Sequence, residues 1–171
     1  ADRRPLFPFG WGLSYTTFRY QNLRLAAPTI SATGETTVSV DVTNTSSRAG
    51  DEVAQMYVHQ RVSSVTRAVI QLKGFKRVRL SPGETRTVSF KVGAEELKLL
   101  NRDMRWVVEP GVFDIMVGAS SVDTASVALS VPVVAVALAR GRRAKAATPE
   151  TRVAATPREP SLALVLGLAY T

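Results

Sequence analysis

The amino-acid sequence predicts an all-β fold, an antiparallel β-sandwich. Between residues 20 and 131, short segments alternate apolar and polar side chains with a period of two, as half-buried strands do. Turn-forming residues separate these segments about every ten residues. An apolar fraction of 45% with 21% charged residues is typical of a globular domain with a core.

The first predicted strands span residues 20–25 and 38–42. In the second, Val38, Val40 and Val42 alternate with polar residues, which predicts one buried and one wet face. A turn at residues 33–35 precedes it and a polar connection at residues 44–50 follows it.

Residues 53–59 predict a strand that is apolar on both faces. One face carries Ala54, Met56 and Val58, and the other face carries Val53, Gln55 and Tyr57. A strand of this kind is central in its sheet or covered by a neighbouring domain.

The second half continues the pattern. Strands are expected at residues 72–80 and 87–92, separated by a turn at Ser81-Pro82-Gly83-Glu84. Residues 95–100 form either one helical turn or an irregular crossover. Residues 105–108 and 112–118 are expected to pair as a hairpin around residues 109–111, and residues 126–131 form a last strand.

Seven or eight such strands indicate a sandwich of immunoglobulin or fibronectin type III-like character. The cysteine pair and core tryptophan of antibody domains are missing, which favours the fibronectin type III-like branch. We therefore expect an irregular linker or docking segment at residues 1–18, rich in Pro, Gly and aromatics, and a sandwich at residues 19–131. A tail of low order, native to the domain or not, is expected at residues 132–171.

The composition argues against several other functions. The net charge of +8 is divided equally between residues 1–131 and 132–171, without the basic stripe of a nucleic-acid binder. No apolar run is long enough to span a membrane. There is no cysteine and only one histidine, His59, so no metal site, cofactor or catalytic triad is expected. The cellular compartment stays open, because larger exported proteins also lack cysteine. The abrupt start at Ala1 suggests a piece of a longer chain.

The paired carboxylates do not form a catalytic set. Retaining glycosidases need two carboxyl groups about 5–5.5 Å apart across a cleft. Asp51 and Glu52 are adjacent on a predicted strand and so point to opposite faces. We expect turn charges or contacts to a neighbouring domain here, and no catalytic residue.

The aromatic cluster before the sandwich is the candidate functional site. Its members are Phe7, Phe9, Trp11, Tyr15 and Phe18. Aromatics at glycine turns anchor interdomain interfaces or stack on sugar rings. We favour anchoring, because the segment precedes the sandwich and leads to whatever came before it.

Several segments together resemble the C-terminal part of glycoside hydrolase family 3, the β-glucosidase and β-xylosidase group. Residues 7–18 are similar to the segment that leads into the family's last domain. Residues 42–45, 50–58, 72–78, 80–84 and 118–121 resemble, in the family's order, its fibronectin type III-like domain. The resemblance runs from about Pro5 to Val131, and the family's chains commonly end near that final strand.

The resemblance implies an accessory domain of a retaining β-glycosidase, whose catalytic nucleophile and acid/base belong to upstream domains. It implies that the catalytic domains of the parent are the partner. The location stays unknown: the resemblance favours a secreted or periplasmic parent and leaves a cytoplasmic one open. An alternative is a module that binds carbohydrate or a cell surface through Trp11, Tyr15, Tyr57 or Trp106.

Overall fold

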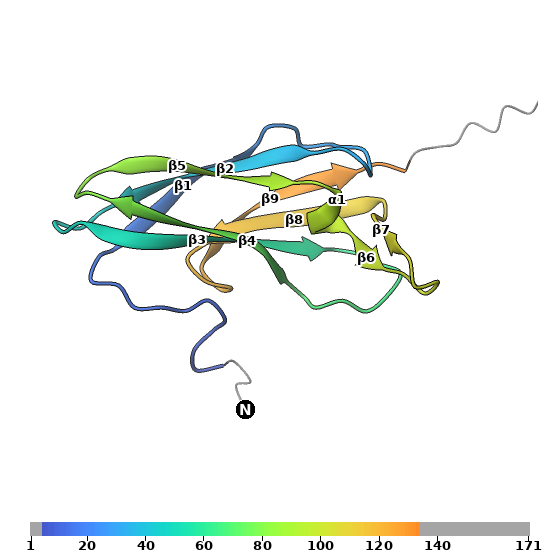
Figure 1. Cartoon of the computed structure of the whole chain (residues 1–171), viewed down its shortest axis with the longest axis horizontal. Coiled ribbons are helices and arrows are strands. Elements are labelled where there is room, and N and C mark those ends of the chain that lie inside the picture. The colour runs from blue at the N-terminus through green and yellow to red at the C-terminus, as the bar shows by residue number, and fades with distance from the viewer. Residues whose placement is uncertain (1–4, 134–171) are drawn as a thin grey trace, which may run out of the picture. The chain divides into compact units, whose positions relative to one another are not determined.

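The structure is a computed structural model and describes residues 5–133. Residues 134–171 of the expected tail and residues 1–4 of the expected linker lie outside the described residues. Two antiparallel sheets pack face to face (Figure 1). One sheet has the order β1-β2-β5, formed by Phe18–Leu25, Thr36–Asn44 and Thr85–Val92. The other has the order β4-β3-β8-β9, formed by Gln71–Leu80, Gly50–Gln60, Gly111–Gly118 and Thr124–Val131. The predicted all-β sandwich is confirmed.

The core lies between the two sheets, where the period-two pattern places it. Valines 38, 40 and 42 of β2 are fully buried, and β5 faces the core with Val88, Phe90 and Val92. The opposite sheet contributes Ala54, Met56 and Val58 from β3 and Phe113, Ile115 and Val117 from β8. The alternation in β2 predicted its buried face, whereas the sequence left open which of the two apolar faces of β3 turns inward.

Strand β3 is central in its sheet, which is one of the two alternatives that its apolar faces left open. It pairs with β4 on one side and with β8 on the other. On the side away from the core, Tyr57 is still almost fully buried, at 1% exposure. A second layer must therefore cover the outer face of β3 at this point.

The prediction that residues 105–108 and 112–118 pair as a hairpin is wrong. Strand β7 (Trp106–Val107) pairs with β6 (Leu99–Leu100), and β8 pairs with β3 and β9. Pro110 has no N–H to donate, and the chain uses residues 108–110 to cross from the small β6-β7 ribbon to the large sheet. The alternatives for residues 95–100 resolve into one helical turn, α1 (Ala94–Leu97), followed by β6.

The open side of the sandwich is closed by the connection between β1 and β2. Ile30 donates its amide to the Ser130 carbonyl oxygen (3.0 Å), and Ser130 donates to Pro28 (2.8 Å). This covers the edge strand β9 and joins the two sheets.

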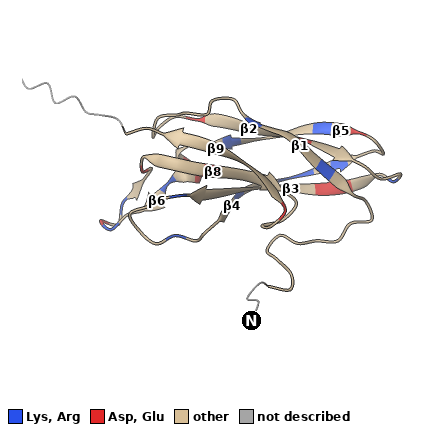
Figure 2. Cartoon of the chain, turned by 180° about the vertical axis from the view of Figure 1, so that it is seen from behind, with Lys and Arg blue, Asp and Glu red and all other residues tan. Residues whose placement is uncertain are grey.

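The two outer faces differ in character. On the β1-β2-β5 sheet, polar side chains bond to one another, as in the Ser39–Ser89 hydroxyl pair (2.8 Å) and the Thr87 hydroxyl on Asp41 (2.7 Å). Charged residues are spread over several strands and loops (Figure 2).

Among the described residues, no helix has the length and apolar character to cross a bilayer.

Candidate docking site

The segment before β1 follows a defined path, which begins with a tight turn. Trp11 donates its amide to the Pro8 carbonyl oxygen (3.0 Å), and Gly10, the third residue of this turn, has φ +78°. A positive φ at that position is the signature of a type II turn and favours glycine. The turn presses Gly10 against the outer face of β3, where an added Cβ would lie 2.1 Å from Gln55 Oε1.

Gln55 fastens this turn to the sheet. Its Nε2 donates to the carbonyl oxygens of Gly10 (3.0 Å) and Ala119 (2.7 Å), and the Tyr57 hydroxyl donates to its Oε1 (2.5 Å). Ser121 adds a backbone bond from its amide to the Phe9 carbonyl oxygen (2.9 Å). The segment is therefore bonded both to β3 and to the β8–β9 loop. It forms the layer that buries Tyr57.

A second anchor lies just before β1. Thr17 donates its amide to Ser46 Oγ (2.7 Å) and its carbonyl oxygen accepts from the Thr45 amide (2.9 Å). Thr16 is buried against Gly50. A Cβ added to Gly50 would lie 2.2 Å from Thr16 Oγ1. The segment is thus fixed at both ends, at Gly10 and at Thr16–Thr17.

Four of the five predicted aromatics project into solvent, three from the anchored stretch and Phe7 from just before it. Phe7, Phe9, Trp11 and Tyr15 are 69%, 66%, 53% and 95% exposed. Leu6 and Leu13 beside them are also exposed. Large apolar side chains that gather on a surface and stay uncovered are typical of an interaction surface.

Phe18 lies apart from the other four. It is the first residue of β1, two residues before the predicted start of that strand, and it packs partly buried against the sandwich core. Its side chain therefore serves the fold.

The structure adds apolar residues that sequence reasoning did not single out. Phe75 is 67% exposed on β4, and Val53 and Leu72 are half-exposed on the same outer face. A hollow of about 290 Å³ lies between Phe9, Tyr57, Ile70, Leu72 and Ser121, so the segment and the sheet form one continuous surface. The exposure of Phe75 could be predicted from the sequence. Side chains alternate between the two faces of a strand, and Phe75 stands an odd number of positions from Val78 and Leu80, which face the core.

We call this surface the docking face. It consists of Phe7, Phe9, Trp11 and Tyr15 of the N-terminal segment and Val53, Leu72 and Phe75 of the sheet.

Asp51 and Glu52 point apart, as expected for neighbours on a strand. Asp51 pairs with Arg77 and, at 3.9 Å, with Arg79 on β4. Glu52 accepts the Tyr20 hydroxyl (2.7 Å), which links β3 to β1 across the end of the sandwich. Burial raises the pKa of the Glu52 carboxyl, and burial together with Glu52 raises the pKa of Tyr20. These carboxylates hold the fold and do not face each other across a cleft.

The remaining candidates lie in different places. The His59 imidazole bonds through Nδ1 to the Val69 carbonyl oxygen (2.5 Å). Of the four aromatics considered for sugar stacking, Tyr57 is buried, and Trp106 stands on the separate β6-β7 ribbon. The four do not share one exposed plane. Within residues 5–133, no group of three His, Cys, Asp or Glu side chains is placed to hold a metal ion.

Comparison with known proteins identifies the domain. Residues 52–121 match the family model of the fibronectin type III-like domain. A β-xylosidase of Formosa agariphila is 60% identical over 121 residues, which are 71% of this chain and 17% of that protein. A β-glucosidase structure from Erythrobacter marinus superposes with a TM-score of 0.74 at 37% identity, over 77% of this chain and 17% of that one. The GH3 β-glucosidase of Bifidobacterium adolescentis gives a TM-score of 0.67 at 33% identity, over 72% and 18%.

The chain contains the fibronectin type III-like domain of a glycoside hydrolase family 3 protein. The match covers less than a fifth of the relatives' length. The similarity to the Formosa protein extends over more of the chain than residues 52–121, since 121 residues align.

Proposed function

We propose that this domain is the non-catalytic C-terminal accessory domain of a retaining β-glycosidase. It stabilises the parent enzyme by packing its docking face on the catalytic domains. The observation that carries the proposal is the docking face itself, which combines exposed aromatics of β4 with those of a segment whose backbone is bonded to β3.

The choice of this side follows from the contrast between the two outer faces. The β1-β2-β5 face is polar, and its side chains satisfy one another. The docking face instead leaves Phe7, Tyr15 and Phe75 uncovered. A few residues supply most of the binding free energy of a typical interface, and aromatic side chains are enriched at interfaces. The relatives are much longer than the part that matches this chain, which supports the presence of further domains in the parent protein.

A non-catalytic role is supported by the placement of the carboxylates. Asp51 is paired with arginines and Glu52 with Tyr20, whereas glycoside hydrolysis needs two carboxyl groups facing one substrate. Asp114 is likewise engaged, because Arg61 donates to both of its oxygens, at distances from 2.7 to 3.2 Å. These groups are occupied in holding the fold.

Hydrolysis of p-nitrophenyl β-glucoside and β-xyloside tests the proposal. The chain alone should be inactive. A truncated form of the Formosa β-xylosidase, lacking the part that matches this chain, should gain activity or thermal stability when the chain is added. Turnover by the purified chain would contradict the non-catalytic role. Absence of both binding and stabilisation on mixing would contradict the accessory role.

A further inference from the structure

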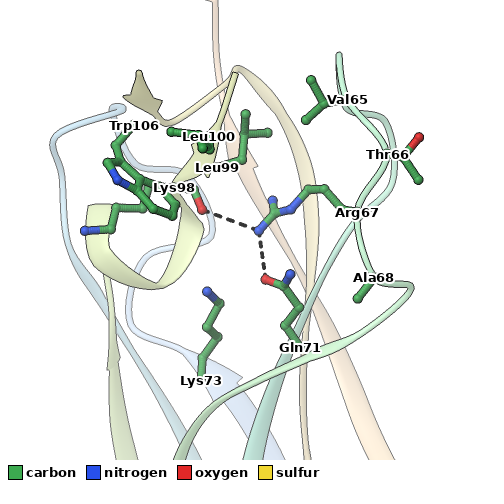
Figure 3. Close-up of a pocket in the computed structure, with 10 residues that line it drawn as sticks. All are labelled: Val65, Thr66, Arg67, Ala68, Gln71, Lys73, Lys98, Leu99, Leu100 and Trp106. Carbon is green, nitrogen blue, oxygen red and sulfur yellow. Dashed lines mark hydrogen bonds between the residues drawn. The ribbon is translucent and has the colours of Figure 1, made fainter. Parts of the chain in front are cut away.

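A second surface feature lies away from the docking face, beyond the end of β3. The β3–β4 loop at residues 61–70 and the β6-β7 ribbon enclose a pocket of about 340 Å³ (Figure 3). This volume lies within the range of about 300–1,000 Å³ that is typical of small-molecule sites. Its lining includes three cations, Arg67, Lys73 and Lys98, and one aromatic side chain, Trp106.

Arg67 is fixed in this pocket by neutral partners. Its guanidinium donates to Gln60 Oε1 (2.5 Å), to Gln71 Oε1 (3.0 Å) and to the Lys98 carbonyl oxygen (3.4 Å). These bonds set the orientation of the guanidinium but leave its charge uncompensated. Burial lowers the pKa of Arg67, as expected where a positive charge loses hydration.

Lys73 points from β4 toward the same space (Figure 3). Within residues 5–133, neither Lys73 nor Arg67 forms an ion pair, whereas Lys98 pairs with Glu95 (2.5 Å). Burial lowers the pKa of Lys73, and the neighbouring Arg67 charge lowers it further. Two half-buried cations thus share one pocket, and an anion between them would relieve both costs.

Nearby carboxylates are engaged elsewhere. Glu109 accepts from the Ser64 amide (3.0 Å) and the Ser64 hydroxyl, and Glu96 accepts from the Gly93 amide (2.9 Å). From a distance and without contact, the Glu109 charge acts to raise the pKa of Arg67, and the Glu96 charge acts to raise the pKa of Lys73.

Trp106 supplies the apolar part of the pocket. Its indole is 65% exposed, and the Lys98 ammonium lies 5.3 Å from the ring centre, which holds the ring in place. A flat aromatic surface beside these cations suits a ligand that has both a ring and a carboxylate.

We propose that this pocket binds a hexuronate, with the ligand carboxylate on Lys73 and Arg67 and its sugar ring against Trp106. The site would let the domain hold an acidic saccharide independently of the docking face. It extends the domain beyond the accessory role and does not depend on that role.

NMR titration of the full ¹⁵N-labelled chain tests the proposal directly, with sodium glucuronate, glucose and sodium acetate as separate ligands. Glucuronate should shift the amides of Arg67 and Lys73 and the indole N–H of Trp106 saturably. Glucose should leave them unchanged, and acetate should bind about tenfold or more weakly because it lacks the ring. Absence of saturable shifts with glucuronate would overturn the proposal, as would equal binding of glucose or of acetate.

Three variants locate the site. Lys73→Met should weaken glucuronate binding about tenfold to hundredfold, the effect of losing one charge-assisted hydrogen bond. Lys91→Met is the matched control, because Lys91 is exposed on β5 and pairs with Glu35 (3.0 Å). Trp106→Ala should weaken glucuronate binding and leave acetate binding unchanged. Unchanged glucuronate affinity in both the Lys73 and Trp106 variants, with native amide spectra, would overturn the assignment.

Discussion

The side-chain amide of Gln55 donates to the Gly10 carbonyl oxygen at 3.0 Å, and so joins the centre of the large sheet to the N-terminal segment. The same amide bonds the Ala119 carbonyl oxygen, and the Tyr57 hydroxyl bonds its oxygen. One buried glutamine therefore sets the position of the segment that displays Phe9 and Trp11. The docking face depends on this polar contact as much as on its aromatics.

Replacing Gln55 by leucine should release the segment. The variant leaves the carbonyl oxygens of Gly10 and Ala119 and the Tyr57 hydroxyl without their partner, at a cost of about 1–3 kcal/mol in free energy of unfolding. Urea unfolding measures that cost. Hydrogen exchange should quicken at the Trp11 and Ser121 amides, and unchanged exchange there would show that Gln55 does not hold the segment.

Gly10→Ala should disturb the same contact from the other side. Alanine at φ +78° is strained, and its Cβ would meet Gln55 Oε1 and the Tyr57 hydroxyl. We expect a loss of about 1–3 kcal/mol in stability. Gly12→Ala is the matched control, since no atom lies within 4 Å of its added Cβ, and its effect should stay within about 0.5 kcal/mol. Equal effects of the two substitutions in urea unfolding would contradict this account of the turn.

The pairing of Glu52 with Tyr20 makes a prediction about pH. Burial raises the pKa of Glu52 above its ordinary value of 4.5, so the folded state holds the proton more tightly than the unfolded state. The free energy of unfolding therefore falls as pH rises from about 4.5 through the folded pKa. Glu52→Gln keeps an oxygen to accept the Tyr20 hydroxyl and removes the titration.

The Gln variant should thus gain stability relative to the natural chain as pH rises. At about pH 4 the two chains should unfold at similar urea concentrations, and at about pH 7 the Gln variant should need more urea. A difference that is constant across this range would mean that the Glu52 carboxyl titrates normally.

Much of the fold could be predicted from sequence because the core strands are half-buried. Val38, Val40 and Val42 alternate with polar residues, and that alternation alone places them on the inner face. The strand with which a short strand pairs cannot be predicted in this way. The turn signal at Glu109-Pro110-Gly111 indicates a change of direction but does not say that β7 pairs with β6.

The candidate site was only partly accessible to the same reasoning. The exposed positions of Phe7, Phe9, Trp11 and Tyr15 depend on a bond from Gln55, 45 residues away from Gly10 in the chain. Phe18 could not be separated from them, because aromatic composition does not tell a docking residue from the first residue of a strand. Phe75 could have been found from its parity on β4.

Phe75→Ser should weaken docking without disturbing the fold. Phe75 is 67% exposed, so its loss should change stability by less than about 1 kcal/mol. Central aromatics of an interface cost about 2 kcal/mol or more in binding when truncated, which is about thirtyfold in Kd. Calorimetric titration with the truncated Formosa enzyme measures the effect. Met104→Ser, at an exposed apolar residue on the β6–β7 loop, is the control and should bind like the natural chain.

The most direct test of the docking face is hydrogen exchange of the chain, measured alone and mixed with the catalytic part of the Formosa β-xylosidase. Our account predicts slower exchange on mixing at residues 6–15 and on β4 around Phe75, with the β1-β2-β5 sheet unchanged. Protection confined to the β1-β2-β5 sheet, or no protection at concentrations that saturate binding, would contradict it.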